Sequence, residues 1–103
     1  MPEKEYLIFL DVDARKRHYH KSKDGKITQL MVQLEIRLEG QWREVIRYDC
    51  AHETIHKDAY NLAGKNRKWG IFLTYEEALS FADKDINEHW ELYRDKFLRG
   101  EFP

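Results

Sequence analysis

The chain has 103 residues and a formal net charge of −1, with 18 Lys and Arg against 19 Asp and Glu. This length predicts one small domain, residues 1–103, and the near-neutral charge excludes a protein that binds nucleic acid through overall basicity, although a local basic patch is still possible. The hydrophobic fraction of 42% suffices for a core, but a domain of this size buries only about two-thirds of its unfolded surface, so its stability is modest unless it forms an oligomer.

Cysteine usage and the N-terminus indicate a cytoplasmic protein. Cys50 is the single cysteine, so no disulfide can form within the chain. The N-terminus lacks the basic and apolar regions of a signal peptide, and the longest apolar stretch, residues 6–10, is too short to cross a bilayer. We therefore expect a soluble protein that does not associate with membranes. The charge-rich composition also resembles that of proteins from thermophiles.

The first part of the chain has two strand patterns separated by a basic segment. Residues 5–13 begin with a continuous apolar run and then alternate, which predicts a strand. Residues 14–26 are basic and end in Asp24-Gly25, a strong hairpin signal, so we expect them to protrude as a basic hairpin. Residues 27–39 alternate between apolar and polar side chains, as a half-buried strand does.

The rest of the chain predicts further strands and then one long helix. Glu39-Gly40 marks a turn, and the strand candidates that follow are residues 42–50, 54–62 and 69–73. Thr74 and Glu77 have the spacing of a capping box, and Gly100 is a natural helix end. An apolar stripe recurs every three or four residues between them, at Ala78, Ala82, Ile86, His89, Trp90, Tyr93 and Phe97. A helix of about 25 residues is long enough to cross a sheet.

These elements together predict an α+β fold. The simplest arrangement is an antiparallel meander sheet of about five strands with one long C-terminal amphipathic helix packed on one face. A single helix need not cover such a sheet completely. Apolar surface left bare by the helix would favour a homodimer.

Residues 47–58 carry the side chains best suited to chemistry near neutral pH. They are Arg47, Tyr48, Asp49, His52, Glu53, His56 and Asp58. A tight turn at Ala51-His52 would place Arg47 opposite His56, with Asp49 on the same face. A three-residue turn would instead place Tyr48 opposite His56. The sequence leaves both registers open.

One interpretation of this hairpin is acid–base catalysis on an RNA phosphodiester. His52 or His56 would take a proton from the ribose 2′-hydroxyl, and the other His, or Tyr48, would donate a proton to the leaving oxygen. Asp49 would orient an imidazole, and Arg47 would stabilise the charge that develops on the phosphate. This chemistry requires no metal and no cofactor.

Two other interpretations of the same residues stay open. The hairpin can be a polar strand face with ordinary cross-strand pairs, such as Arg with Asp. A metal site is the other alternative, because His52 and His56 are four residues apart and a turn would bring them closer. His18 and His20, with Asp49 or Glu53, could complete that site.

The basic segment is the second candidate for function. Residues 14–26 contain six Lys or Arg against Asp24 alone, with aromatic and His side chains between them. Such a hairpin could bind an RNA backbone and stack a base, although charge runs are usually solvated surface. The candidate nucleic-acid-binding residues here are Arg15, Lys16, Arg17, His18, Tyr19, His20 and Lys21, together with Arg47 in the hairpin.

The hairpin also carries a resemblance to a known family. The run Arg47-Tyr48-Asp49-x-Ala51-His52-x3-His56-x-Asp58, followed by a helix with Trp90, Tyr93, Arg94 and Phe97, resembles small domains related to the TumE-like toxins of toxin–antitoxin modules. The similarity covers about residues 28–99. It implies a compact α+β fold that acts on RNA and is neutralised by an antitoxin-like protein. Glu53 departs from the pattern, since Gly is often expected there.

The sequence therefore supports two hypotheses of function. The first is a small toxin–antitoxin-type protein acting on RNA, in its enzymatic form a metal-independent ribonuclease with His52, His56, Asp49 and Tyr48 as catalytic candidates. The alternative is a non-enzymatic protein-interaction or dimerisation module, in which the polar groups of the hairpin are structural. Fold-level similarity alone cannot decide between them.

Overall fold

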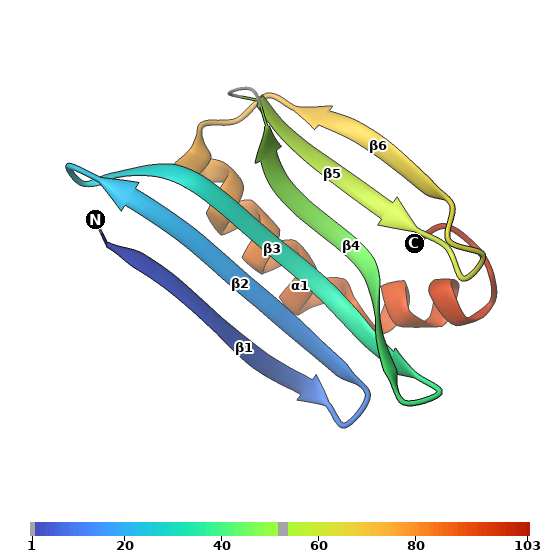
Figure 1. The fold of residues 1–103 in the computed structure, drawn as a ribbon. Coiled ribbons are helices and arrows are strands. Elements are labelled where there is room, and N and C mark those ends of the chain that lie inside the picture. Colours follow the sequence, from blue (N-terminus) through green and yellow to red (C-terminus); the bar gives the residue numbers. More distant parts are fainter. Residues whose placement is uncertain (1, 52–53) are drawn as a thin grey trace.

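The computed structural model describes residues 2–51 and 54–103, which form a sheet of six strands and one helix (Figure 1). The elements in chain order are β1 (Glu3–Asp11), β2 (Ala14–Lys23), β3 (Lys26–Leu38), β4 (Gln41–Ala51), β5 (Thr54–Tyr60), β6 (Asn66–Ile71) and α1 (Tyr75–Leu98). The sheet is an antiparallel meander in the order β1-β2-β3-β4-β5-β6. The predicted α+β fold is confirmed, with six strands rather than about five.

The additional strand is formed by the basic segment. We predicted that this segment would protrude as a hairpin, but it is part of the sheet. Residues 14–23 form β2, which pairs with β1 on one side and with β3 on the other. The first strand ends at Asp11, and a turn at Val12-Asp13 leads into β2. The prediction was wrong because β2 has charged side chains on both faces, so the sequence does not show the alternation of apolar and polar residues that indicates a strand. On each face of the sheet, neighbouring residues provide partners for these charges.

Two of the hairpin turns follow directly from local residue chemistry, as predicted. Asp24 and Gly25 have φ of 52° and 78°, and Glu39 and Gly40 have the same pair of values. Two successive positive φ values are typical of a type I′ turn, which matches the twist of the strands it joins.

The helix begins and ends where the sequence predicts. Thr74 is the N-cap, and its hydroxyl accepts from the Glu77 backbone while the Glu77 carboxylate accepts from the Thr74 backbone. At the other end, Gly100 has a φ of 78°, and the amides of Gly100 and Glu101 bond the carbonyls of Phe97 and Lys96. This pair of bonds is a Schellman motif, which satisfies carbonyls that the helix end leaves open.

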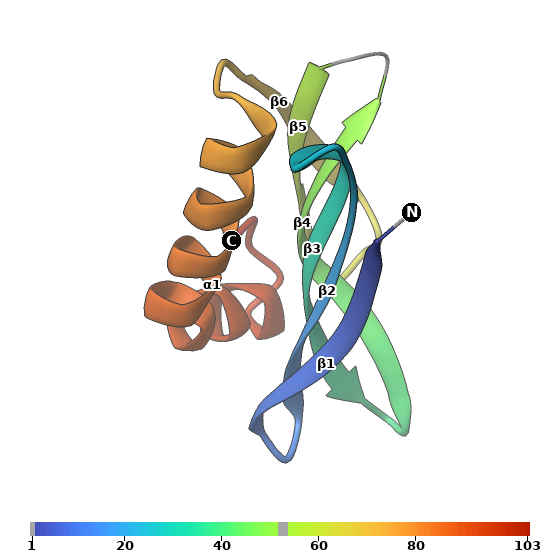
Figure 2. The same ribbon diagram turned by 90° about the vertical axis from the view of Figure 1, so that its left-hand side faces the viewer.

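The fold has two layers, with α1 on one face of the sheet (Figure 2). The helix packs chiefly over β3 and β4. The core between the layers includes Val32, Leu34, Ile36, Val45, Ile46, Tyr48, Ala82, Ile86 and Phe97. We call the other side of the sheet, which no described element covers, the open face. Within the part of the chain that the structure describes, no helix is long and apolar enough to span a membrane.

Candidate functional site

The residues predicted to form a catalytic site are divided between the two faces of the sheet. Because side chains alternate along β4, Arg47 and Asp49 lie on the open face, whereas Tyr48 points toward α1 and is fully buried. His56 lies opposite Asp49 and therefore shares the open face with it. Tyr48 thus cannot act together with Asp49 and His56 on one substrate atom.

The β4–β5 hairpin has neither of the two registers considered from the sequence. Asp49 pairs with His56, Arg47 with Asp58 and Ala51 with Thr54. β4 therefore continues through Ala51, which the sequence had placed in the turn. Arg47, Asp49 and His56 nevertheless share one face, as the two-residue turn predicted. The catalytic candidate His52 lies outside the described residues.

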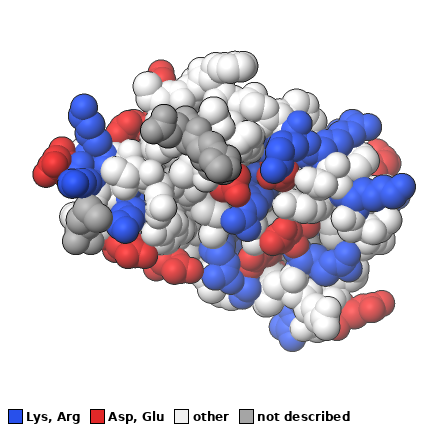
Figure 3. Space-filling view, turned by 45° about the horizontal axis from the view of Figure 1, so that its top comes forward, with Lys and Arg blue, Asp and Glu red and all other residues white. Residues whose placement is uncertain are grey.

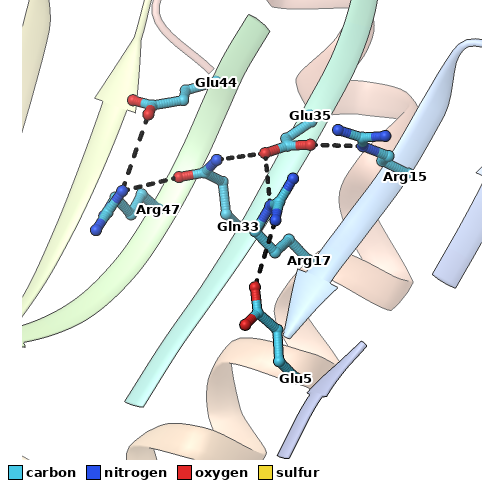
Figure 4. A network of polar contacts seen from close by, with 7 residues as sticks. All are labelled: Glu5, Arg15, Arg17, Gln33, Glu35, Glu44 and Arg47. Atoms are coloured by element: carbon cyan, nitrogen blue, oxygen red, sulfur yellow. Dashed lines mark hydrogen bonds and ion pairs between the residues drawn. The ribbon is translucent and has the colours of Figure 1, made fainter. Parts of the chain in front are cut away.

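The open face carries a network of charged and amide side chains (Figure 4). Glu35 is its centre: its carboxylate accepts from Arg15 at 2.6 Å, from Arg17 at 3.2 Å and from Gln33 at 2.6 Å. Gln33 in turn accepts from Arg47 at 3.3 Å. The network joins β2, β3 and β4 through side chains alone.

Long side chains bury the centre of this network, although no described element lies above it. The exposed fractions are 4% for Gln33 and 5% for Glu35. Burial by itself would raise the pKa of Glu35, but the hydrogen bonds from Arg15, Gln33 and Arg17 outweigh it and hold that pKa below the usual value. Glu35 is therefore ionised at neutral pH and neutralises part of the basic character of β2.

Two further charged groups on the open face are also engaged within the chain. Arg47 donates to Asp49 at 3.0 Å, and Asp58 accepts from Asn66 at 3.1 Å. His56 Nε2 lies 3.0 Å from the Thr54 hydroxyl oxygen. On the side of the molecule in Figure 3, Lys and Arg are interspersed with Asp and Glu. Arg15, Arg17 and Arg47 of the expected basic surface are thus paired with acidic or amide side chains.

The other half of the basic segment is buried beneath α1. Lys16 and His18 are 3% and 2% exposed, and both contact Asp83 of the helix, at 3.0 and 3.3 Å. His18 Nε2 lies 2.8 Å from Nδ1 of His20, and the Tyr6 ring stacks on His18 at 4.5 Å. This burial gives no support to the prediction of Lys16 and His18 as nucleic-acid ligands, since alternation directs them into the layer interface. Arg15, Arg17, Tyr19 and Lys21 lie on the opposite, open face.

A second polar cluster, missed in the sequence, surrounds Asp85 of α1. Its carboxylate accepts from the hydroxyls of Tyr48 at 2.5 Å and Tyr93 at 2.7 Å. Lys57 Nζ approaches it at 3.4 Å and His89 Nδ1 at 3.0 Å. The helical spacings of Asp85, His89 and Tyr93 could have indicated this cluster, because residues four apart lie on one helix face.

The Asp85 cluster connects the two layers. Burial and the Asp85 carboxylate raise the pKa values of the Tyr48 and Tyr93 hydroxyls, so both remain protonated donors. Lys57 Nζ also lies 5.4 Å from the ring centroid of Tyr48 and 5.3 Å from that of Tyr93. Because these groups satisfy one another's hydrogen bonds and charges, we interpret the cluster as a structural contact between the helix and the sheet rather than as a reactive centre. Among the described residues, no group of three or more His, Cys, Asp or Glu is arranged to hold a metal ion.

A run of exposed apolar side chains lies on β1, the outermost strand on one side of the sheet, while other apolar side chains, among them Trp69, Phe72 and Leu92, are exposed elsewhere. Four consecutive side chains, which we call the β1 belt, are exposed: Tyr6 (41%), Leu7 (42%), Ile8 (39%) and Phe9 (61%). The helix reaches the end of β1, where Arg94 binds Asp11 at 3.1 Å, but it leaves the belt open (Figure 2). The belt is thus a surface without the ion pairing that occupies the rest of the sheet.

Comparison with known proteins places the chain in a family without assigning a function. The whole chain, residues 1–103, matches the model of a family described as a domain of unknown function, DUF7718. No curated protein and no solved structure matches the chain. The resemblance to TumE-like toxins therefore stays a prediction. On the match over its full length, the chain belongs to the DUF7718 family.

Proposed function

We propose that this protein is a non-enzymatic interaction module and that β1 is the strand through which it binds a protein partner. The observation that supports the proposal is the β1 belt, four exposed apolar side chains in succession on an edge strand. Contiguous exposed apolar surface is typical of binding sites in soluble proteins.

The position of the belt at an edge suits strand addition. An edge strand presents backbone N–H and C=O groups that are free to pair with another strand, and β1 has nine residues. Its apolar side chains alternate between the two faces, so a partner strand would find apolar neighbours on both. Main-chain bonds would then supply affinity, and the side chains specificity.

The polar groups give less support to the ribonuclease hypothesis. Arg15 and Arg17 bind Glu35, and Arg47 binds Asp49, so these cations would have to leave their partners in order to hold phosphate. The proposed catalytic groups also lie on two faces. We therefore favour the interaction module over an enzyme acting on RNA.

Site-specific photocrosslinking tests this proposal. A photoreactive benzoylphenylalanine is placed at Phe9 in the full chain, and the protein is irradiated in the cells that produce it. The control carries the same group at Phe72, which is fully exposed and follows β6 at the other side of the sheet. We expect a discrete protein adduct from position 9 and none of the same size from position 72.

Mass spectrometry of the adduct would identify the protein bound to β1. Crosslinking at position 9 to no protein at all would overturn the proposal, as would equal adducts from both positions. Adducts with RNA from position 9, together with cleavage of RNA by the purified protein, would restore the enzymatic hypothesis.

A further inference from the structure

We infer that the partner of β1 is a second copy of this chain, joined by antiparallel pairing of the two β1 strands about a two-fold axis. This inference rests on the proposed function and names its partner. The two sheets would become one continuous sheet, with both helices on the same side, because a two-fold axis perpendicular to the sheet preserves its faces.

The distribution of charge along β1 favours a copy of itself. The charged residues lie at the two ends, with Glu3, Lys4 and Glu5 at one end and Asp11 at the other, and residues 6–10 between them are uncharged. An antiparallel copy centred on Leu7 would place residues 6–8 of the two strands against each other, with Phe9 opposite Glu5 and Asp11 opposite Glu3 toward the exposed ends of the pair. Burial of apolar side chains without burial of charge is what stabilises a protein interface.

The geometry of the strand selects a register centred on Leu7. Leu7 would then face Leu7 of the second copy on the open face, and Tyr6 would face Ile8 of the second copy on the helix side. Aromatic and β-branched residues directly opposite each other stabilise antiparallel pairs. β1 is regular from Glu3 to Phe9, and its irregularity lies between Phe9 and Asp11, beyond this centre.

The opposite edge of the sheet is a poorer surface for association. β6 has only six residues, and its exposed Trp69 lies between the cation Lys68 and Gly70, with Arg67 also exposed. Charged side chains and short length are features that protect edge strands from pairing. Pairing of β1 with β6 of another copy would also leave free edges and grow without closure, whereas β1 with β1 closes as a dimer.

The dimer should be reversible rather than permanent. Its interface consists of one pair of strands about 30 Å long together with the side chains of the two β1 belts. The surface area that such a pair buries is small compared with the roughly 1,200–2,000 Å² buried in standard protein interfaces. The helix lies chiefly over β3 and β4, so we do not count α1 as part of the contact. We therefore expect association that depends on protein concentration.

Sedimentation of the purified full chain tests the inference. We expect the mass to rise from 12.5 kDa toward twice that value as the concentration increases. The variant Leu7→Lys should remain a monomer at every concentration, because it places two like charges opposite each other at the centre. The matched control is Leu92→Lys on α1, where a leucine of similar exposure is replaced, and it should dimerise like the natural chain.

Disulfide formation tests the register independently of affinity. In a Cys50→Ala background, Leu7→Cys should form a disulfide-linked dimer on mild oxidation, since opposite Cα atoms about 4.5–5.5 Å apart lie within the range that disulfides span. Phe9→Cys lies on the same face but would face Glu5 of the second copy, so it should crosslink poorly. Equal crosslinking of both variants would contradict the register.

The outcomes separate this inference from the proposed function. A protein that stays at 12.5 kDa at all concentrations overturns self-pairing. If photocrosslinking at position 9 then captures a different protein, β1 is still the interaction strand but its partner is not a second copy. If it captures nothing, both proposals fall together. Association unchanged in Leu7→Lys would place the dimer interface elsewhere.

Discussion

Tyr48 and Asp85 are joined across the two layers of the fold: the Tyr48 hydroxyl on β4 donates to Asp85 Oδ2 on α1 at 2.5 Å. Tyr48 is fully buried, and its ring meets Phe81 of the helix at 6.0 Å. The Tyr48 side chain thus contributes both to the docking of α1 on the sheet and to keeping the Asp85 carboxylate ionised.

Replacing Tyr48 by Phe should destabilise the protein without changing its shape. The variant keeps the buried ring but removes a charge-assisted donor from Asp85, which costs about 1–3 kcal/mol. Urea unfolding monitored by fluorescence measures this difference. Tyr19→Phe is the control, because the Tyr19 hydroxyl bonds the exposed Gln29 at 3.3 Å and its loss should cost far less. If both variants lose the same free energy of unfolding, the hydrogen bond to Asp85 contributes no more to stability than the exposed bond to Gln29.

The ionisation of Asp85 predicts a pH dependence in the acid range. Burial would raise its pKa, but hydrogen bonds from Tyr48 and Tyr93 and the charge of Lys57 outweigh it and hold the pKa below 3.8. A carboxyl group with a lowered folded pKa stabilises the fold above its unfolded pKa, and this contribution disappears as the pH falls through the folded value.

Asp85→Asn therefore differs most from the natural chain above about pH 4, and the difference should shrink at lower pH. Melting temperatures of both proteins from about pH 7 to about pH 2 would measure this convergence. A constant difference across the range would contradict an ionised Asp85 as the source of the stability. Below the folded pKa of Asp85, Lys57 faces a neutral group in both proteins, so this part of the difference should also vanish at low pH.

The elements that the sequence predicted well are those specified by local chemistry. The capping box at Thr74 and the turn at Asp24-Gly25 involve residues within a few positions of each other, so their signals are complete in the sequence. β2 was missed because its period of two consists of charged residues. Lys16 can be buried because Asp83 and Asn87 bind its ammonium group. Both residues lie far along the chain, and the sequence did not identify them as partners of Lys16.

Contacts between residues far apart in the sequence were also what the sequence could not predict for the candidate site. Of the two registers that the sequence left open, the two-residue turn placed Arg47, Asp49 and His56 on one face, and they do share it, because an even shift of register preserves the side on which they lie. The sequence could not indicate that Arg47 is engaged by Gln33 from the neighbouring strand. It also treated Tyr93 as a core residue of the helical stripe, whereas its hydroxyl completes the Asp85 cluster.

Glu35 should be the most important charged residue of the open face for stability. Glu35→Ala removes the acceptor shared by Arg15, Arg17 and Gln33 and leaves partly buried donors without it, at a cost of about 1–3 kcal/mol. Glu44→Ala is the matched control, because Glu44 is 43% exposed and meets Arg47 at 3.8 Å. Its loss should cost less than about 1 kcal/mol. Chemical denaturation of the two variants compares them, and a reversed order would mean that the network does not stabilise the sheet.

The pair of His18 and His20 predicts a second pH dependence, near neutrality. The two rings share a hydrogen bond of 2.8 Å, so one nitrogen must act as acceptor and the rings cannot both be fully protonated while it persists. Burial lowers the pKa of His20 below 6.5, and the nearby His18 and Lys4 lower it further, although Asp83 opposes them.

A histidine with a lowered folded pKa contributes its full stability above its unfolded pKa. That contribution declines as the pH falls from 6.5 toward the folded value and then stays constant, because the unfolded chain binds the proton more readily. Since Tyr6 of β1 stacks on His18, the loosening should be visible as weaker protection of the β1 amides against hydrogen exchange, relative to the intrinsic exchange rate at each pH. In His20→Gln this loss of protection between about pH 7 and about pH 5 should be absent, whereas its persistence in that variant would assign the effect to a different group.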